Sequence, residues 1–216
     1  MAIKPILFNM KMVREILDGR KSCTRRIVKH DVGAILNSPY NRENPDVDDK
    51  QIISKLCIPP YQPGDILYVR ETWKKAPNGY YYYEDWQKND IADITKWHPS
   101  IHMPKEAARI WLKVMDVRVE RLQEMKPVDV IKEGAYPDCW DCLNTYGESG
   151  SQCCYGTEEQ CSQCDEVMRE WEKLWNATIK NSDLDRYGWN ANPWVWIIEF
   201  ERCEKPKEES EETQHE

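Results

Sequence analysis

The residues with the clearest capacity for chemistry lie between positions 19 and 26, where the sequence reads GRKSCTRR. Gly19 lets the chain turn sharply, so that the polar side chains after it can converge on one pocket. Lys21 and Arg26 carry cationic donors suited to a phosphate or a base edge, and the hydroxyl of Thr24 both donates and accepts. The residue types leave two interpretations open, a ligand-binding pocket or an exposed basic loop.

A second group of polar residues follows a predicted strand at residues 66–69, which a Pro-Gly-Asp turn precedes. Trp73 is a candidate for stacking on a base. Glu71 is either an acid of the site or a strand-end carboxylate in a surface ion pair. The candidate substrate-binding residues are Arg26, Arg70, Glu71 and Trp73.

Nine cysteines form the third feature, and four of them make two Cys-x2-Cys pairs. Two such turns can bring four thiolates into a tetrahedron around zinc, so the predicted ligands are Cys139, Cys142, Cys161 and Cys164. No histidine lies between them, which favours a structural zinc over a catalytic one. Redox-active or merely reduced cysteines are the alternative, and the roles of Cys153 and Cys154 stay open.

The composition is that of a globular protein, with 216 residues, 31% charged and 40% hydrophobic. No apolar run is long enough to span a membrane and no secretory signal opens the chain, so we expect a cytoplasmic protein with no membrane partner. The net charge of −8 opposes nonspecific nucleic-acid binding. Residues 1–30 are nevertheless basic, with eight cationic and two acidic side chains, which indicates either a binding surface or a solvated helix face.

The elements that must position these residues follow from hydrophobic spacing. Helices are predicted at residues 10–18, 127–133 and 166–179, and strands at 3–8, 66–69, 80–83, 109–122 and 194–200. Pro5 places the first strand at a sheet edge or marks a strand start, and a bulge or slip is expected near Met115. Residues 37–50 are predicted to form a loop. No βαβ rhythm appears, so an α+β barrel or sandwich is favoured.

The motif Gly19, Lys21, Thr24 and Arg26 resembles the Gly-x-Lys-x-x-Thr-x-Arg pattern of the ASCH family, a branch of the PUA-like folds. Further matches follow in order along residues 1–203. The segments 63–65 and 69–73 resemble the family's second strand, and Glu133-Gly134 resembles the short acidic helix end after its long strand. The segments 171–175 and 190–196 resemble the end of larger phage- or prophage-associated members. The resemblance implies a PUA-like β-barrel with flanking helices. We expect one domain over residues 1–203, a cysteine-rich insertion at about 136–165, and a disordered acidic tail over 204–216.

The resemblance also implies nucleotide or RNA chemistry in the cytoplasm of a bacterium or of a phage-infected host. Some small ASCH proteins are amidohydrolases that remove the acetyl group from N4-acetylcytidine. Carried over to this chain, their catalytic set becomes Lys21, Thr24 and Glu133, with Thr24 as nucleophile and Lys21 as its base. Glu133 would orient the lysine or move a proton. A charged clamp on the substrate is the alternative role of Lys21.

Three functions therefore stand beside one another at this point. The first is an enzyme acting on a modified cytidine, free or in RNA. The second is a binding module that reads RNA or a modified base without chemistry. The third is a zinc-stabilised phage accessory protein that binds a protein partner of unknown identity. A nucleoside- or RNA-directed role is favoured over a purely protein-directed one.

Overall fold

A computed structural model describes residues 1–39, 41, 46–86, 96–135 and 162–206 of the chain. The fold is mixed α+β, built on a five-stranded sheet in the order β1-β3-β6-β7-β2 with a separate β4-β5 hairpin. The sheet strands are β1 (Ile3–Leu7), β2 (Cys23–Ile27), β3 (Ile66–Arg70), β6 (Trp111–Arg121) and β7 (Trp194–Cys203). The hairpin strands are β4 (Trp73–Ala76) and β5 (Gly79–Tyr82).

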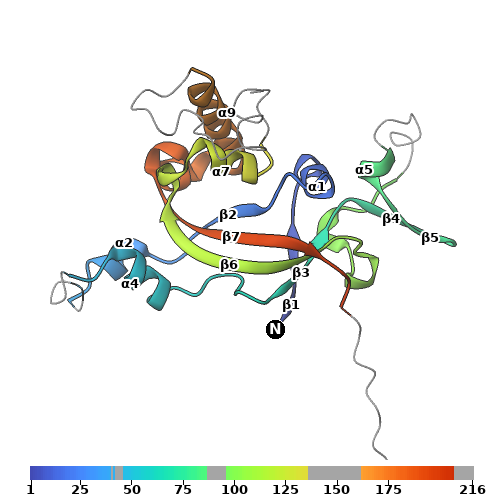
Figure 1. Cartoon of the computed structure of the whole chain (residues 1–216), viewed down its shortest axis with the longest axis horizontal. Coiled ribbons are helices and arrows are strands. Elements are labelled where there is room, and N and C mark those ends of the chain that lie inside the picture. Colours follow the sequence, from blue (N-terminus) through green and yellow to red (C-terminus); the bar gives the residue numbers. More distant parts are fainter. Residues whose placement is uncertain (40, 42–45, 87–95, 136–161, 207–216) are drawn as a thin grey trace, which may run out of the picture.

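The longer helices cover the sheet on different sides (Figure 1). They are α1 (Met10–Leu17), α4 (Asp49–Leu56), α7 (Pro127–Lys132) and α9 (Ser162–Thr178), with the shorter α2 (Val32–Leu36), α5 (Tyr83–Trp86) and α10 (Leu184–Tyr187) between them. Figure 1 shows α7 and α9 together near one end of β7, and the β4-β5 hairpin projecting from the other end of the sheet. Among the residues described, no helix is both long and apolar enough to cross a membrane.

The long central pair β6-β7 forms the middle of the sheet. Its antiparallel register shifts between Val114 and Asp116, which confirms the bulge predicted near Met115. The extra residue leaves Met115 with its side chain exposed, while Val114 stays buried. The sheet curves strongly along this pair (Figure 1).

The two sheet edges do not pair with each other, so the predicted closed barrel is wrong for the strands described here. Instead, side chains cover the outer edge of β1. The hydroxyl of Tyr61 donates to the carbonyl of Pro5 at 2.9 Å, and Nη2 of Arg26 donates to the carbonyl of Leu7 at 2.9 Å. Pro5 lies in an edge strand as predicted, because it has no N–H to give to a ladder. Only the Arg26 hydrogen bond joins the two edge strands, β2 and β1, while Tyr61 reaches β1 from the loop before β3.

Three apolar clusters hold these layers together. The largest lies between the sheet and α1 and includes Ile6, Ile16, Leu67 and Ile198. A second cluster joins β7 to α7 and α9, where Trp171 and Trp175 are buried. The prediction that the tryptophans at 171, 175, 194 and 196 are core residues is confirmed, since each is at most 8% exposed.

Several elements differ from the prediction. The strands β2 and β4 and the helices α2, α4, α5 and α10 were not predicted. Helix α4 takes residues 49 and 50 out of the predicted loop. Tyr83 starts α5 rather than ending a strand. The acidic tail beyond residue 206 and most of the cysteine-rich insertion lie outside the described residues.

Candidate functional site

The GRKSCTRR motif places its lysine in a buried polar site between α1, β2 and the end of α7. Helix α1 begins at the Asn9 cap, whose side chain accepts from the N–H of Met12. It ends at Gly19, which has φ of +77°, a left-handed conformation that glycine adopts without strain. The chain then turns toward β2, and the side chain of Lys21 enters the interior.

The ammonium of Lys21 has three acceptors. Nζ donates to Glu133 Oε2 at 2.8 Å, to the backbone carbonyl of Glu133 at 2.7 Å, and to the carbonyl of Cys23 at 2.7 Å. The side chains of Lys21 and Glu133 are 0% and 1% exposed. Three acceptors match the three donors of an ammonium, so the buried charge is fully hydrogen-bonded.

Arg25 adds a second cation to Glu133. Its Nη1 lies 3.1 Å from Glu133 Oε1, and its Nη2 lies 3.5 Å from Asp129 Oδ2. No role was predicted for Arg25, because its partners lie more than 100 residues away in the sequence and no local pattern marks them. The two cations and two carboxylates form one network that ties β2 to α7.

A glycine makes this close approach of α7 possible. Gly134 has φ of +74° and follows the helix directly. A Cβ at Gly134 would lie 2.7 Å from the Cβ of Glu15 and 3.0 Å from the Cβ of Lys21. The predicted Glu133-Gly134 pair therefore has a physical reason: the glycine lets the chain pass against α1 while the glutamate reaches Lys21.

The remaining motif residues lie on the other face of β2. Alternation along a strand puts Cys23 and Arg25 on one face and Thr24 and Arg26 on the opposite face. Thr24 is buried, and its hydroxyl makes no hydrogen bond to Lys21 or Glu133 in the described structure. The structure thus brings Lys21 and Glu133 together, whereas the side chain of Thr24 lies on the face of β2 opposite to Arg25.

Cys23 is enclosed by the same network, and burial is the main reason that its pKa rises to about 12. The nearby carboxylate of Glu133 acts in the same direction, and the cations of Arg25 and Lys21 act against it. The thiol therefore stays protonated at neutral pH and is a poor nucleophile.

Arg70 and Glu71, two of the other predicted substrate-binding residues, stand at the end of β3 and directly after it. Glu71 is buried and accepts two hydrogen bonds from Arg109, at 2.9 and 2.8 Å, rather than sitting in a surface ion pair. Arg70 donates to the carbonyl of Ile101 and to the hydroxyl of Tyr68. Glu71 and Arg70 therefore do not join Lys21 in one site.

Trp73 was the predicted stacking residue, and the structure does not present it for stacking. It is only 8% exposed and packs against Tyr80 and His98, at centroid distances of 5.8 and 5.1 Å. Trp73 holds the β4-β5 hairpin against the sheet instead of facing solvent.

A groove of about 570 Å³ lies along the outer edge of β2. Its walls come from β2, the end of α9, the loop at residues 58–61, and Trp196 of β7. Tyr61 and Arg26, which both donate a hydrogen bond to a carbonyl of β1, line it. Trp175 and Trp196 are buried side chains that give the groove an aromatic floor.

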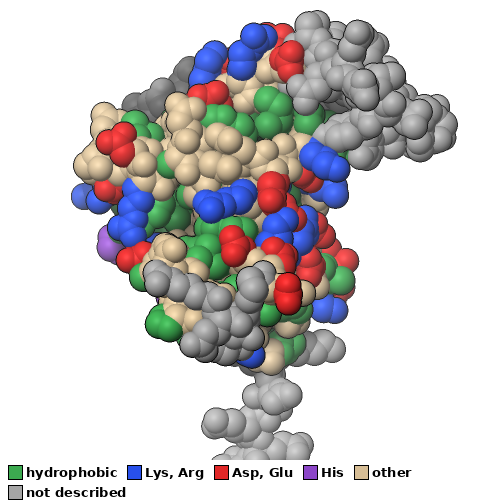
Figure 2. Space-filling view, turned by 90° about the vertical axis from the view of Figure 1, so that its left-hand side faces the viewer, with side chains coloured by type: hydrophobic (Ala, Val, Ile, Leu, Met, Phe, Trp, Pro, Cys, Tyr) green, Lys and Arg blue, Asp and Glu red, His purple; other side chains and the backbone are tan. Residues whose placement is uncertain are grey.

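The charge of this groove is uniform. Its lining contains Arg25, Arg26, Lys29 and His30, and no Asp or Glu is among the described residues that line it. Figure 2 shows one side of the molecule, on which cationic and anionic side chains are mixed around exposed hydrophobic ones. The basic segment at residues 1–30 thus contributes a concave surface, which the net charge of the chain does not reveal.

Lys29, His30 and Tyr61 are the groove residues that the sequence did not single out. A weak signal was present, since the basic run RRIVKH continues the motif through position 30. Tyr61 gave no signal, because it reaches the groove from a loop far along the chain.

The predicted zinc ligands are only partly within the described chain. Cys139, Cys142 and Cys161 lie outside the described residues, and Cys164 falls in the first turn of α9. Elsewhere in the described residues, no group of three metal-ligating side chains comes together. The zinc site stays a prediction.

Comparison with known proteins gives two distant structural likenesses. An ASCH domain from Lactobacillus crispatus JV V101 aligns with a TM-score of 0.38 and 7% identity, over 93% of this chain and 79% of that one. A hypothetical protein, PH0355, aligns with a TM-score of 0.34 and 13% identity, over 94% of this chain and 100% of that one. Both TM-scores are too low to carry an argument about fold or function. No family model matches the sequence, and no curated protein does.

Proposed function

We propose that this chain is an ASCH-type, RNA-directed protein that holds a single strand in the groove beside β2. The observation that carries the proposal is the groove's lining, which combines cationic side chains with aromatic ones and lacks carboxylates among the described residues. Arg and Lys supply the phosphate contacts that dominate the affinity for nucleic acid. Aromatic side chains supply stacking that tolerates any base.

The groove residues divide into two roles. Lys29 and His30 are exposed at the rim, where they can follow a phosphate backbone. Tyr61 is half-buried and presents part of its ring in the groove, so it is the proposed stacking residue. Arg25 already neutralises Glu133 and contributes less to a phosphate.

The test is the binding of a fluorescent single-stranded RNA, measured by anisotropy at low salt. Lys29→Glu places an anion at the rim and is expected to weaken binding at least about tenfold, because like charges now face the phosphates. Retention of wild-type affinity in Lys29→Glu would remove the groove from RNA binding.

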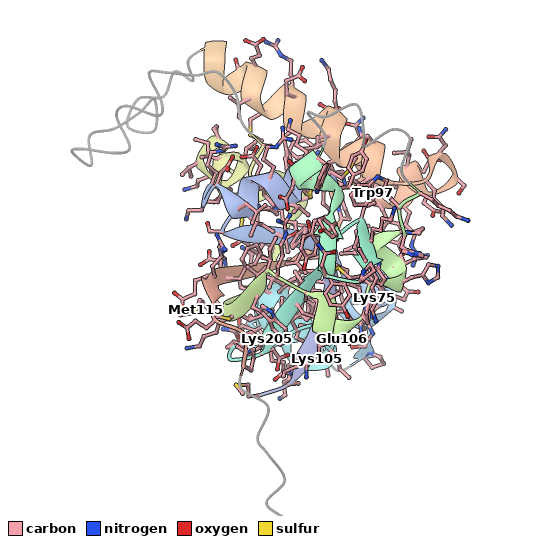
Figure 3. The ribbon with its side chains drawn as sticks, turned by 90° about the vertical axis from the view of Figure 1, so that its right-hand side faces the viewer. Lys75, Trp97, Lys105, Glu106, Met115 and Lys205 are labelled. Carbon is pink, nitrogen blue, oxygen red and sulfur yellow. The ribbon has the colours of Figure 1, made fainter. Side chains whose placement is uncertain are left out.

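Lys75 offers a matched control for this variant. It is an exposed lysine on β4, and Figure 3 shows it on the right-hand side of the molecule, in a strand that contributes nothing to the groove. Lys75→Glu makes the same change in net charge and is expected to alter affinity much less. Equal losses in the two variants would indicate a general charge effect instead of a binding site.

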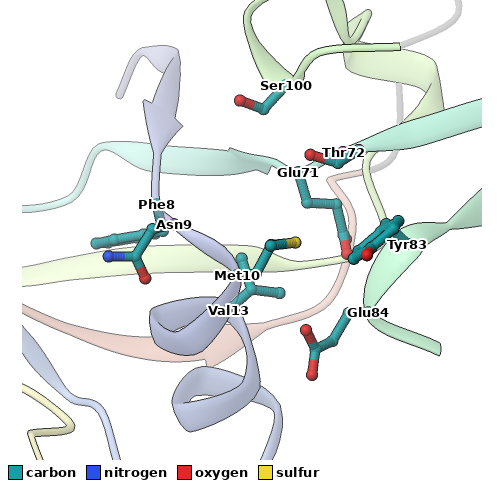
Figure 4. Close-up of a pocket in the computed structure, with 9 residues that line it drawn as sticks. All are labelled: Phe8, Asn9, Met10, Val13, Glu71, Thr72, Tyr83, Glu84 and Ser100. Carbon is teal, nitrogen blue, oxygen red and sulfur yellow. The ribbon is translucent and has the colours of Figure 1, made fainter. Parts of the chain in front are cut away.

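Amidohydrolysis of an N4-acetylcytidine-type nucleoside is the second candidate function. Its support is the contact between Lys21 and Glu133, the two residues that the resemblance assigned to catalysis together with Thr24. Activation of Thr24 by Lys21 requires a lone pair on Nζ, so one of the lysine's three hydrogen bonds must open first. Neither the groove nor a cavity of about 190 Å³ between Phe8, Glu71 and Tyr83 (Figure 4) is lined by these three side chains.

Chromatography of cytidine after incubation with N4-acetylcytidine tests this second candidate. Activity that disappears in Lys21→Ala and in Thr24→Val would support it. Absence of product with folded wild-type protein would leave RNA binding as the function.

A further inference from the structure

The groove beside β2 follows the edge of that strand. Alternation along the strand puts Arg25 and Ile27 on one face of β2 and Arg26 on the other, yet all three side chains line the groove. Side chains from both faces of a strand border one space where that space runs along the strand's edge. β2 is such an edge strand, because it stands last in the order of the described sheet, beside β7 (Figure 1).

Backbone groups of β2 point into this groove without a partner. The N–H of Val28 and the carbonyl of Ser22 both bond to β7, so the even-numbered residues of the strand carry its ladder. Hydrogen-bonding direction alternates along an antiparallel strand, and the N–H and C=O groups of Arg25 and Ile27 therefore point away from β7. Within the described part of the chain, no hydrogen bond reaches these four groups.

The facing edge of β1 is more thoroughly blocked. The carbonyls of Pro5 and Leu7 accept from Tyr61 and Arg26, each at 2.9 Å, and Pro5 has no N–H to offer. An unblocked strand edge is a template on which another extended segment can pair. Of the two edges of the described sheet, β2 is thus the one suited to bind an extended peptide as an added strand.

The charge of the groove favours an acidic peptide. Lys29 and His30 are exposed in its lining, to which no Asp or Glu of the described residues contributes. Residues 207–216 of this same chain carry five glutamates and one lysine. Glu209 and Glu211 are two positions apart, so an extended strand projects both carboxylates to the same side. The sequence of this segment therefore complements the groove in charge.

The acidic segment is long enough to reach the groove. Trp196 stands opposite Arg26 in the register of β2 with β7, and β7 ends seven residues further on at Cys203. Seven residues of strand span about 24 Å. The thirteen residues from 204 to 216 span up to about 43 Å when extended. A chain that turns back after β7 would run parallel to β2, with several residues left to lie beside it.

We propose that the outer edge of β2 binds residues 207–216 as an added strand, with the backbone of Arg25 and Ile27 as its ladder and Lys29 and His30 as its charged partners. The segment occupies the space assigned above to RNA, so it acts as an intramolecular competitor. The competition rests on the proposed function, whereas the docking of the segment does not.

Hydrogen exchange at the backbone amide of Ile27, followed by NMR on the full chain, tests the docking without RNA. The double variant Glu211→Lys/Glu212→Lys is expected to exchange this amide at least about tenfold faster than the wild type, because docking protects it. Glu106→Lys/Glu166→Lys makes the same change in net charge at exposed positions outside the groove and should leave the rate unchanged. Equal rates in the wild type and the Glu211/Glu212 variant would overturn the docking.

A variant on the groove side tests the same contact. Lys29→Glu repels the acidic segment and is expected to accelerate exchange at Ile27, while Lys75→Glu, outside the groove, is not. The wild-type rate should not depend on protein concentration. Protection that grows with concentration would place the segment on a second copy and refute docking within one chain.

RNA affinity separates this inference from the proposed function. If the segment leaves the groove open in about one molecule in ten, RNA binds with about a tenth of its intrinsic affinity. The Glu211→Lys/Glu212→Lys variant should therefore bind single-stranded RNA about tenfold more tightly than the Glu106→Lys/Glu166→Lys variant. Equal RNA affinity in these two variants would reject the competition. Absence of RNA binding in every variant, with the exchange result as expected, would reject the proposed function and leave the docking in place.

Discussion

Nζ of Lys21 lies 2.8 Å from Oε2 of Glu133, although 112 residues separate them in the chain. Both side chains are buried, and Arg25 contacts the same carboxylate. This contact joins the motif after α1 to the end of α7, and it therefore fixes the position of β2 relative to α7. The edge of β2 that it positions is the edge that forms the cationic groove.

Removal of the ammonium should therefore destabilise the fold. Lys21→Met leaves the Glu133 carboxylate buried with only Arg25 beside it, and loss of one partner of a buried ion pair costs about 3–5 kcal/mol. Urea unfolding followed by circular dichroism measures the loss. Lys50→Ala breaks an exposed pair with Glu124 and serves as the control, with an expected change below about 1 kcal/mol. Similar losses in both variants would contradict a structural role for the buried pair.

Gly134 and Gly19 offer a matched test of the close approach between α7 and α1. Both have left-handed φ, +74° and +77°, so an alanine at either meets the same backbone strain of about 1–2 kcal/mol. Only Gly134→Ala also places a Cβ against Glu15 and Lys21, which adds about 1–3 kcal/mol of overpacking. Gly134→Ala should thus be the more destabilising variant in urea unfolding. An equal effect at the two positions would show that the contact is unimportant.

Asp65 gives the clearest pH dependence. Burial alone would raise its pKa, but hydrogen bonds from Lys4 and from the N–H groups of Ala2 and Gln62 lower the pKa below the usual range. Because the folded-state pKa is depressed, the carboxylate stabilises the fold above its unfolded pKa of about 3.9 and loses that contribution as pH falls through the folded value.

Asp65→Asn should accordingly reduce the free energy of unfolding at neutral pH by about 1.5–3 kcal/mol, the range for hydrogen bonds to a charged group. The difference from the wild type is expected to narrow as pH falls below about 4. Urea unfolding over a series of pH values measures it. A difference that stays constant, or widens, toward acid would contradict the assigned ion pair.

Two substitutions of Tyr61 distinguish the stacking role of its ring from the structural role of its hydroxyl. Tyr61→Phe keeps the ring and removes the hydrogen bond to the carbonyl of Pro5, so it should lower stability by about 0.5–1.5 kcal/mol and leave RNA affinity nearly unchanged. Tyr61→Ala removes the ring as well and should weaken RNA binding by about 1–3 kcal/mol, the value for one stacked base. Equal RNA affinity in both variants would exclude Tyr61 as a stacking residue.

The sequence predicted the elements whose apolar residues follow a period. The helix predicted at residues 166–179 has such a period, and the structure has α9 at Ser162–Thr178. The bulge near Met115 and the edge strand that contains Pro5 have local signatures of another kind, a slip in strand alternation and a missing N–H. Strand β2 has none, because adjacent arginines read as a polar loop. It can form a strand because the cationic side chains have partners that are distant in sequence. Arg25 forms an ion pair with Glu133 at the end of α7, and Arg26 donates to a carbonyl of β1.

The site was predictable to a similar degree. The resemblance paired Lys21 with Glu133, and the structure brings these two residues together. It did not indicate that Thr24 faces away from Arg25, which only strand formation decides. Trp73 is predicted as a stacking residue, and Glu71 as either an acid of the site or a carboxylate in a surface ion pair. In the structure Trp73 packs against Tyr80 of the β4-β5 hairpin, and Glu71 is buried against Arg109.

The salt dependence of RNA binding tests the cationic groove most directly. If Arg26 and Lys29 each neutralise one phosphate of a single strand, the logarithm of the binding constant should fall with the logarithm of salt concentration at a slope of about −1.4. Lys29→Ala should reduce that slope by about 0.7 while Lys75→Ala leaves it unchanged. Affinity that does not vary with salt, or a slope that Lys29→Ala fails to change, would contradict the account.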